Sequence, residues 1–251
     1  MKMFARAILF ASLVLTPAPL FAQETAVAAP EAPEITITVT DTANLRTLAD
    51  QQGYDGQSAA NYLFVVPAKT NILGKQGGGR GIDTGKWPEG ASLVLLIQGN
   101  VYGGGGNGAD GGDTPAVRDG GRGGDAIYVQ APIGIAITKT GSVKAGGGGG
   151  AGADGIGSGG GGGFPNGKGG EGGSALQGDG GIIVAGNRGY YGTPGGGGKG
   201  GQRGASGGDG GNAGQPGQSL NRLGGGEGFA IRTNDFPVAL DNKGDLRGQV
   251  G

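Results

Sequence analysis

Glycine supplies almost half of one long stretch of this chain. Residues 145–228 hold 41 glycines in 84 positions, and only 8 of these positions are Leu, Ile, Val or Phe. A stretch with so few apolar side chains cannot bury a core of the usual kind. Either it is disordered, or its backbone packs against backbone and each N–H and C=O group bonds to a neighbouring segment.

The spacing of the glycines favours order. Glycine occupies every third position from Gly186 to Gly210, nine times in register. A period of three residues is that of the extended polyproline-II helix, which has no internal hydrogen bonds. Collagen shares the period but needs far more proline, and 186–210 contains only Pro194. The pattern therefore favours a bundle or sandwich of polyglycine-II helices within one chain.

The first 34 residues indicate export. Lys2 and Arg6 precede a short apolar run at 7–15, and a cleavage site follows at Ala22, which is the layout of a secretory signal peptide. The apolar run is far shorter than the roughly 20 residues that span a bilayer. We therefore expect a signal peptide at 1–22, a flexible leader at 23–34 and no membrane span once the signal is removed. The predicted location is outside the cell or at the cell surface, with the periplasm as an alternative.

Residues 35–102 have a more ordinary composition, with 18 Leu, Ile, Val or Phe in 68 positions. Alternating apolar residues predict strands, and Leu45 and Leu48 predict a helix capped by Thr42. These elements are expected at 35–40, 62–66 and 92–98 for the strands and at 42–52 for the helix. The predicted fold is a small β-rich (α+β) part at 35–102, followed by a polyglycine-II domain at 103–251 with interspersed short strands and a C-terminal strand.

A degenerate repeat links the two parts. An apolar strand, a turn closed by glycine and a single aliphatic residue recur at 91–101, 135–143 and 237–246. The first two copies run directly into a glycine tract, and the third leads to the end of the chain. A strand and turn repeated in this way predict stacked coils or layers, and they tie the C-terminal residues into the fold.

Several chemistries are excluded by composition. With no Cys and no His, the chain forms no disulfide, no Cys/His zinc site and no catalytic triad with a His base. Its net charge of −1 gives no basic surface for nucleic acid. Residues 120–128 and 149–157 fit a calcium-binding nonapeptide, but they start 29 residues apart, which is not a multiple of nine. We expect no catalytic residue, no cofactor and no metal site, although calcium binding stays open.

Bulky or charged islands interrupt the glycine tracts. On rigid helices they would lie in the loops at the helix ends, where exposed aromatic and Arg side chains carry binding energy. The alternative is that they only cap or bridge the glycine layer. The candidate receptor-binding residues are Phe164, Asn166, Arg188, Tyr190, Tyr191 and Arg203.

With these features the chain resembles the glycine-rich tail-fibre-tip adhesins of T4-like bacteriophages, which recognise receptors, and related exported glycine-rich proteins. The matching features are the strand at 35–40, the block at 44–56, the strand and turn at 95–101, and the long interrupted glycine tracts. The resemblance implies a polyglycine-II sandwich whose distal loops, the islands above among them, touch an outer-membrane receptor or glycan. The signal peptide departs from the pattern, because phage adhesins assemble in the host cytoplasm and need none.

The sequence therefore predicts an exported, adhesin-like recognition module and not an enzyme. It would present variable loops on a polyglycine scaffold to a cell-surface protein or glycan. The alternative is a structural envelope protein or ice-associated glycine-rich protein without a specific ligand. The receptor and self-association are left open.

Overall fold

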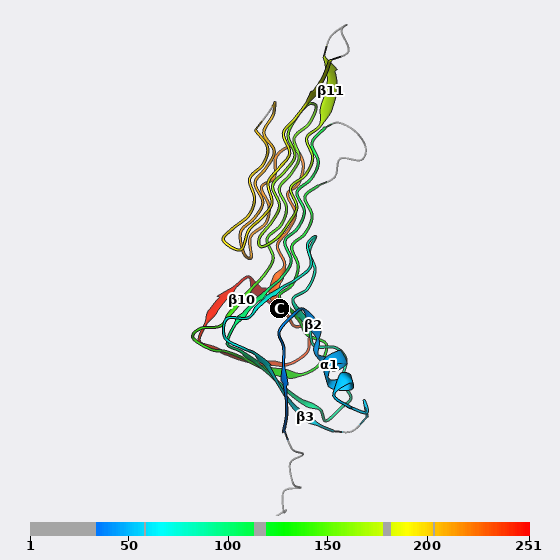
Figure 1. Cartoon of the computed structure of the whole chain (residues 1–251), viewed down its shortest axis with the longest axis vertical. Coiled ribbons are helices and arrows are strands. Elements are labelled where there is room, and N and C mark those ends of the chain that lie inside the picture. The colour runs from blue at the N-terminus through cyan, green and yellow to red at the C-terminus, as the bar shows by residue number, and fades with distance from the viewer. Residues whose placement is uncertain (1–33, 58, 113–118, 178–181, 203) are drawn as a thin grey trace, which may run out of the picture. The chain divides into compact units, whose positions relative to one another are not determined.

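Three parallel β-sheets take their strands in rotation along the chain (Figure 1). The computed structural model describes residues 34–57, 59–112, 119–177, 182–202 and 204–251, and residues 32–251 form one packing unit. The predicted signal peptide at 1–22 and all of the predicted leader except Glu34 lie outside the described residues.

From β3 onward, each turn of the chain gives one strand to each of the three sheets. The sheet orders are β1-β3-β6-β9-β14, β4-β7-β10-β15 and β2-β5-β8-β13-β16. The bounds are β1 (Glu34–Thr38), β2 (Ala43–Asn44), β3 (Asn61–Val66), β4 (Asn71–Leu73), β5 (Ile82–Asp83), β6 (Ser92–Ile97), β7 (Asn100–Tyr102), β8 (Ile127–Tyr128), β9 (Ile133–Ile137), β10 (Ser142–Lys144), β13 (Phe229–Arg232), β14 (Val238–Asn242), β15 (Asp245–Arg247) and β16 (Gln249–Val250). The chain is therefore β-rich, and its strands form a stack of three-sided coils.

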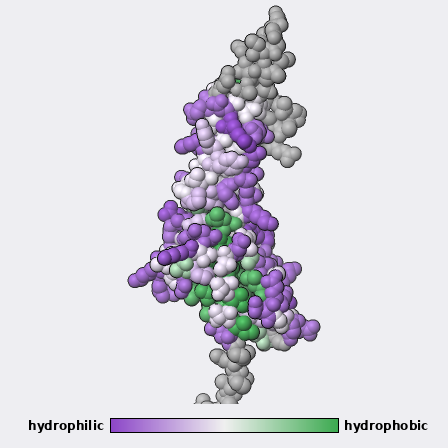
Figure 2. All heavy atoms as spheres, viewed as in Figure 1, coloured by the Kyte–Doolittle hydropathy of each residue, from purple (hydrophilic) through white to green (hydrophobic). Residues whose placement is uncertain are grey.

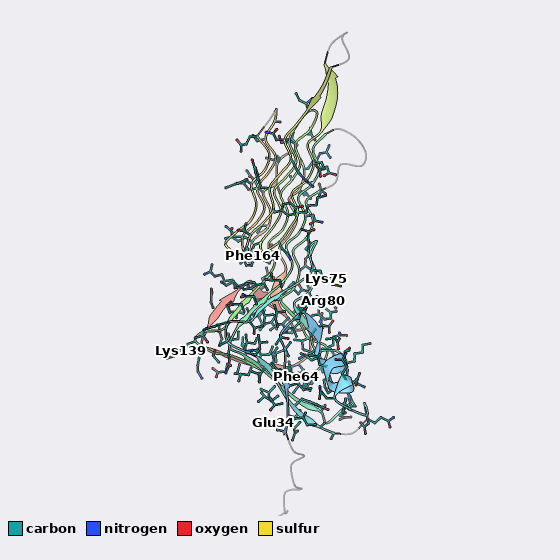
Figure 3. The ribbon with its side chains drawn as sticks, in the orientation of Figure 1. Glu34, Phe64, Lys75, Arg80, Lys139 and Phe164 are labelled. Atoms are coloured by element: carbon teal, nitrogen blue, oxygen red, sulfur yellow. The ribbon has the colours of Figure 1, made fainter. Side chains whose placement is uncertain are left out.

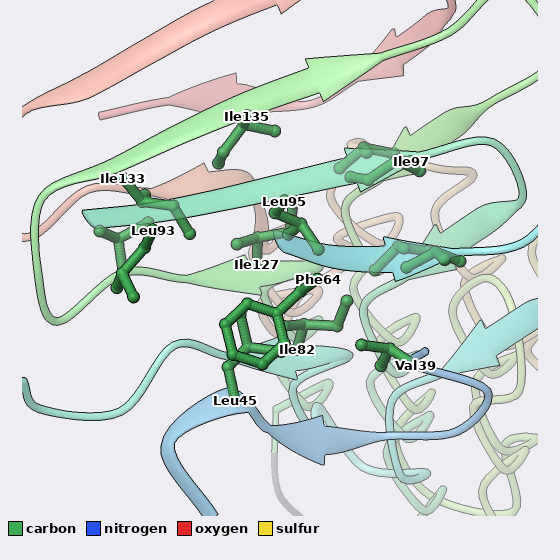
Figure 4. Packing of buried hydrophobic residues seen from close by; sticks show 14 of the residues in the cluster. Val39, Leu45, Phe64, Ile82, Leu93, Leu95, Ile97, Ile127, Ile133 and Ile135 are labelled. Carbon is green, nitrogen blue, oxygen red and sulfur yellow. The ribbon is translucent and has the colours of Figure 1, made fainter. Parts of the chain in front are cut away.

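The core lies between the three sheets. Residues alternate between inside and outside along the longer strands, as the half-buried pattern predicts, and equivalent inward residues of successive coils lie in register. Phe64, Leu95 and Ile135 form one such row, and Ile82, Ile127 and Ile231 form another. All six are 0–1% exposed, and Figure 4 labels all of them except Ile231 and shows these five in one interior.

The predicted strand-and-turn repeat is confirmed. Its three copies are β6–β7, β9–β10 and β14–β15, and they stack in register. The repeated glycines lie at the corner between two sheets, where the chain packs against the preceding coil. A Cβ at Gly141 would meet the Ile97 carbonyl, and a Cβ at Gly244 would meet the Gly141 carbonyl. A side chain has no room there, which explains the glycine in each copy.

The one helix among the described residues, α1 (Leu45–Gln51), joins β2 to β3. The prediction placed the cap at Thr42, and this detail is wrong. Asn44 is the cap, and its Oδ1 accepts a hydrogen bond from the Thr47 N–H at 3.1 Å. Asn is as good a cap as Thr, and the turn that starts at Asn44 brings Leu45 into the core, where it is 0% exposed.

The glycine-rich stretches are inserted into the coils at one corner. They leave the sheet of β4, β7 and β10 and return to the sheet of β5, β8 and β13, which gives segments at 74–81, 103–126 and 145–228. The longest includes a two-stranded antiparallel hairpin of β11 (Ser174–Gln177) and β12 (Ile182–Ala185). The expected division at residue 102 is thus not a boundary between packing units, because the coils continue after each insertion.

Backbone hydrogen bonds join the glycine-rich segments. In the segment 145–153, successive N–H groups take three different neighbours in turn: those of 146 and 149 bond to 121–124, those of 147 and 150 to 161–164, and those of 148 and 151 to 215–218. Donors to the same neighbour are therefore three residues apart. Figure 2 shows the hydrophobic residues of the visible face gathered mainly over the strands.

The segment 157–164 is enclosed on all sides. Its N–H groups bond to the segments 205–211, 187–190 and 106–109, and its carbonyls accept from 167–173, 147–153 and 198–201. It thus has six neighbours. A Cβ added at Gly160, Gly161 or Gly163 would lie under 3.0 Å from a neighbouring backbone carbonyl. Only glycine fits at these positions, so backbone packs on backbone as the composition predicted.

Candidate functional site

The glycine-rich segments run alternately away from the strands and back, so their turns fall at two ends. We define the inner turns as 164–167, 193–196 and 212–215 and the outer turns as 154–156, 204–206 and 219–223. Figure 1 shows the segments side by side. The two groups of turns have different neighbours, and the difference decides which of them is available to a partner.

Two of the three inner turns, 164–167 and 212–215, are tied to the coils or to residues that directly follow the strands of the coils. Asn166 donates from Nδ2 to the Gly74 carbonyl at 2.9 Å and accepts at Oδ1 from the Gly105 N–H at 2.9 Å. The ring of Phe164 lies edge-on to Tyr102 of β7, with 5.4 Å between centroids. In the inner turn 212–215, the Gly214 N–H bonds to the Ala145 carbonyl at 3.1 Å. These turns are joints between the two parts of the fold.

The outer turns bond to one another instead. Arg222 places Nε 2.7 Å from the Asp154 carboxylate and donates from Nη2 to the Gly112 carbonyl at 2.9 Å. Asn221 donates to the other oxygen of Asp154 at 3.3 Å. The Ser158 N–H bonds to the carbonyl of Ala205 at 2.9 Å. Three turns that are distant in sequence are thereby held as one surface.

The central charge of this surface is stabilised by its neighbours. The hydrogen bond from Arg222, and then the one from Asn221, lowers the pKa of the Asp154 carboxyl below its usual value. The carboxylate is therefore charged at neutral pH, with both oxygens engaged.

A hollow of about 300 Å³ opens between these turns. Its volume is at the small end of the range for ligand pockets. It is lined by Gly152, Ala153, Asp154, Ala205, Ser206, Leu220 and Asn221. Apolar side chains lie exposed at the outer turns, namely Ile156 (37% exposed), Leu220 (42%) and Leu223 (66%). Exposed aliphatic groups next to a shallow hollow are typical of a surface that binds a partner.

Two of the residues predicted for receptor binding are not on a free loop. Phe164 is 3% exposed, and its label in Figure 3 lies where the glycine segments join the strands. Both ends of the Asn166 amide are used within the fold. The expectation that this island is a distal loop is wrong, because the bulky side chains fill the joint between two kinds of backbone packing.

The other predicted residues lie elsewhere. Tyr190 (62% exposed) and Tyr191 (50%) project from the segment that leads into the inner turn 193–196. Arg188, on the same segment, places Nη2 2.7 Å from Glu171. Arg203 lies outside the described residues. The structure does not bring the five described members of the predicted set together at one site.

The sequence analysis missed Leu220, Leu223, Ile156 and the Asp154–Arg222 pair. One signal could have found them. Each island that interrupts the glycine tracts marks a reversal of the chain. Every second island after β10 therefore falls at the end where the outer turns lie, and 154–156 is the first of these.

Within the described part of the chain, no helix is long and apolar enough to cross a membrane. The same residues contain no group of three or more Asp or Glu side chains placed to hold a metal ion.

Comparison with known proteins identifies a family and a fold. A family model described as phage tail fibre adhesin Gp38 matches residues 34–251. A solved structure, the crystal structure of the gp37–gp38 adhesin tip complex of the bacteriophage S16 long tail fibre, is similar with a TM-score of 0.60 and 24% sequence identity, over 88% of this chain and 82% of that chain. No curated protein matches.

Proposed function

We propose, since this chain belongs to the phage tail fibre adhesin Gp38 family, that it recognises a receptor on the surface of a bacterial cell through its outer turns. Membership of an adhesin family points to binding and not to catalysis. It supports the predicted recognition module over the alternative of a structural or ice-associated protein.

The observation that carries the proposal is the contrast between the two ends of the glycine-rich segments. The inner turns 164–167 and 212–215 bond to residues that directly follow the strands of the coils, and Phe164 packs on Tyr102 of β7, whereas the outer turns bond to one another and leave Leu220, Leu223 and Ile156 exposed. Bonds between the turns hold these side chains before a partner arrives, so little ordering entropy is lost on binding. The receptor would be a cell-surface protein or glycan.

We also propose that the glycine-rich segments are polyglycine-II helices. Donors three residues apart that serve the same neighbour, as in 145–153, match the period of that helix. Amide hydrogen exchange on the intact chain tests this. Slow exchange is expected throughout 157–164, and exchange at the rate of an unstructured chain would refute it.

We propose that the chain also sits on a fibre protein. The gp38 of the similar structure forms a complex with gp37 at an adhesin tip. The last coil, β14 to β16, provides unpaired sheet edges and exposes Leu240 (38%) and Val250 (46%), so it is our candidate for this contact.

Two leucine substitutions distinguish receptor binding by the outer turns from binding of a fibre protein by the last coil. Leu223→Ser, in an outer turn, should abolish binding of the fluorescently labelled protein to susceptible cells in a panel of Gram-negative bacteria. Leu240→Ser, on β14, should leave cell binding unchanged, because it changes an exposed leucine on another surface. Equal cell binding by Leu223→Ser and the unmodified protein, at equal thermal stability, would contradict the proposal.

Of the residues predicted from sequence, Arg188, Tyr190 and Tyr191 remain candidate receptor contacts on the side of the glycine-rich segments. Alanine substitution at the two tyrosines should reduce cell binding less than Leu223→Ser does, because these residues lie outside the outer turns. A larger loss at the tyrosines would move the site to this face.

A further inference from the structure

We propose that a second hollow, at the inner turns, binds an acidic saccharide, meaning a sugar ring that carries a carboxylate or a phosphate. This junction pocket has a volume of about 470 Å³ and is lined by Lys144, Arg247, Asn212, Gln215, Phe164 and Pro194, among others. It shares no lining residue with the hollow at the outer turns. The inference therefore does not depend on where the receptor binds.

The net positive charge of the pocket favours binding of an anion. Asp245 accepts from Lys144 Nζ at 2.9 Å and from Arg247 Nε at 3.0 Å. One carboxylate between two cations leaves a net positive charge. The Nη groups of Arg247 make no hydrogen bond within the described part of the chain, so they can form a paired contact with a planar carboxylate or with a phosphate.

Amide donors stand beside these cations. Asn212 accepts at Oδ1 from the Gly197 N–H at 2.9 Å, which fixes its amide and leaves Nδ2 without a partner among the described residues. The side-chain amide of Gln215 makes no hydrogen bond to any described residue. Fixed and unpaired amides of this kind are suited to bind the hydroxyl groups of a ligand.

Part of the pocket lining is apolar. The ring of Phe164 lies edge-on to Tyr102, and Phe164 and Pro194 both line the pocket. A pocket that combines a few apolar residues with directed polar groups fits a small organic ring. An inorganic anion would use only the cations, and a neutral sugar would leave the positive charge unmatched. An acidic sugar uses all three features.

The test is titration of the full chain, followed by NMR, with galacturonate, glucose 6-phosphate, glucose and inorganic phosphate. Galacturonate, glucose 6-phosphate or both should shift the resonances of Asn212 and Gln215, more weakly at high salt. Which of them binds distinguishes a carboxylate from a phosphate. Glucose and inorganic phosphate should bind at least about tenfold more weakly, a factor that corresponds to about 1.4 kcal/mol.

Two variants localise the binding. Arg247→Gln removes the guanidinium and should weaken binding at least about tenfold. Gly195→Trp fills the pocket without changing its charge, because a Cβ at Gly195 has only the Thr193 Oγ1 within 4 Å, at 3.8 Å. The matched control is Arg122→Gln, another half-exposed arginine paired with a carboxylate, which should bind as the unmodified protein does.

Four results would overturn the proposal. They are no binding of either acidic sugar at the highest soluble concentration, equal binding of inorganic phosphate, equal binding of glucose, and unchanged binding by both pocket variants when their melting temperatures match that of the unmodified protein.

Discussion

Gly161→Ala tests whether the glycines are needed for space. Gly161 lies in the central segment 157–164, and a Cβ there would meet the Gly198 carbonyl at under 3.0 Å. To make room, the segment 197–201 must move away. That movement strains two hydrogen bonds, from the Gly198 N–H to the Gly162 carbonyl at 2.6 Å and from the Gly201 N–H to the Gly159 carbonyl at 2.9 Å.

The expected magnitude has three parts. Overpacking costs about 1–3 kcal/mol, and the two hydrogen bonds contribute about 0.5–1.5 kcal/mol each. Alanine recovers about 0.4–1 kcal/mol by restricting the unfolded chain. The free energy of unfolding should therefore fall by about 3 kcal/mol, which lowers the melting temperature by about 6–12 °C for a domain of this size.

The assay is thermal and denaturant unfolding, with Gly226→Ala as the matched control. Gly226 is also in a glycine tract, but a Cβ there has nothing within 4 Å. The control should be unchanged or more stable by up to about 1 kcal/mol. A Gly161→Ala protein as stable as the Gly226→Ala protein would refute the view that backbone packs on backbone in this segment.

Two further predictions concern the joint between the strands and the glycine-rich segments. Phe164→Ala should lower the free energy of unfolding by about 3–5 kcal/mol, since the ring is buried, whereas Tyr190→Ala should change it by less than about 0.5 kcal/mol; equal effects in denaturant unfolding would contradict the placement of Phe164. Hydrogen bonds from Arg247, and then from Lys144, lower the pKa of the Asp245 carboxyl. The carboxylate therefore stabilises the fold at pH values above its usual pKa of 3.8, and this contribution is lost as the pH falls through the lowered pKa of the folded state. A ¹³C NMR titration of the carboxyl should show a midpoint below 3.8, and a midpoint at or above that value would refute the pairing.

Much of the fold follows from local patterns in the sequence. The alternation in 92–98 and 62–66 predicts strands that β6 and β3 confirm, because a half-buried strand must place every second residue in the core. The repeat at 91–101, 135–143 and 237–246 predicts stacked coils, and the register of β6, β9 and β14 confirms them. The resemblance to phage tail-fibre adhesins is confirmed by the family match over 34–251.

The site was less predictable, because its location depends on long-range geometry. An island such as Phe164–Asn166 signals that a glycine segment reverses, but its residue types do not say at which end. Phe164 is of a residue type that is common in exposed binding sites, yet its position beside Tyr102 buries it. Leu223 stands out by its exposure, which depends on how three distant turns assemble. The order of the chain reversals after β10 could place its turn at the outer end, but no residue type in the turn does so.

Site-specific photo-crosslinking on intact cells tests most directly whether the outer turns contact the receptor. A photoreactive residue would replace Ser206, exposed in an outer turn, or Tyr191, half exposed on the side of the segments. The account predicts a crosslink to a cell-surface component from position 206 and little or none from position 191. Crosslinking from position 191 alone, or from neither position on cells that bind the protein, would contradict it.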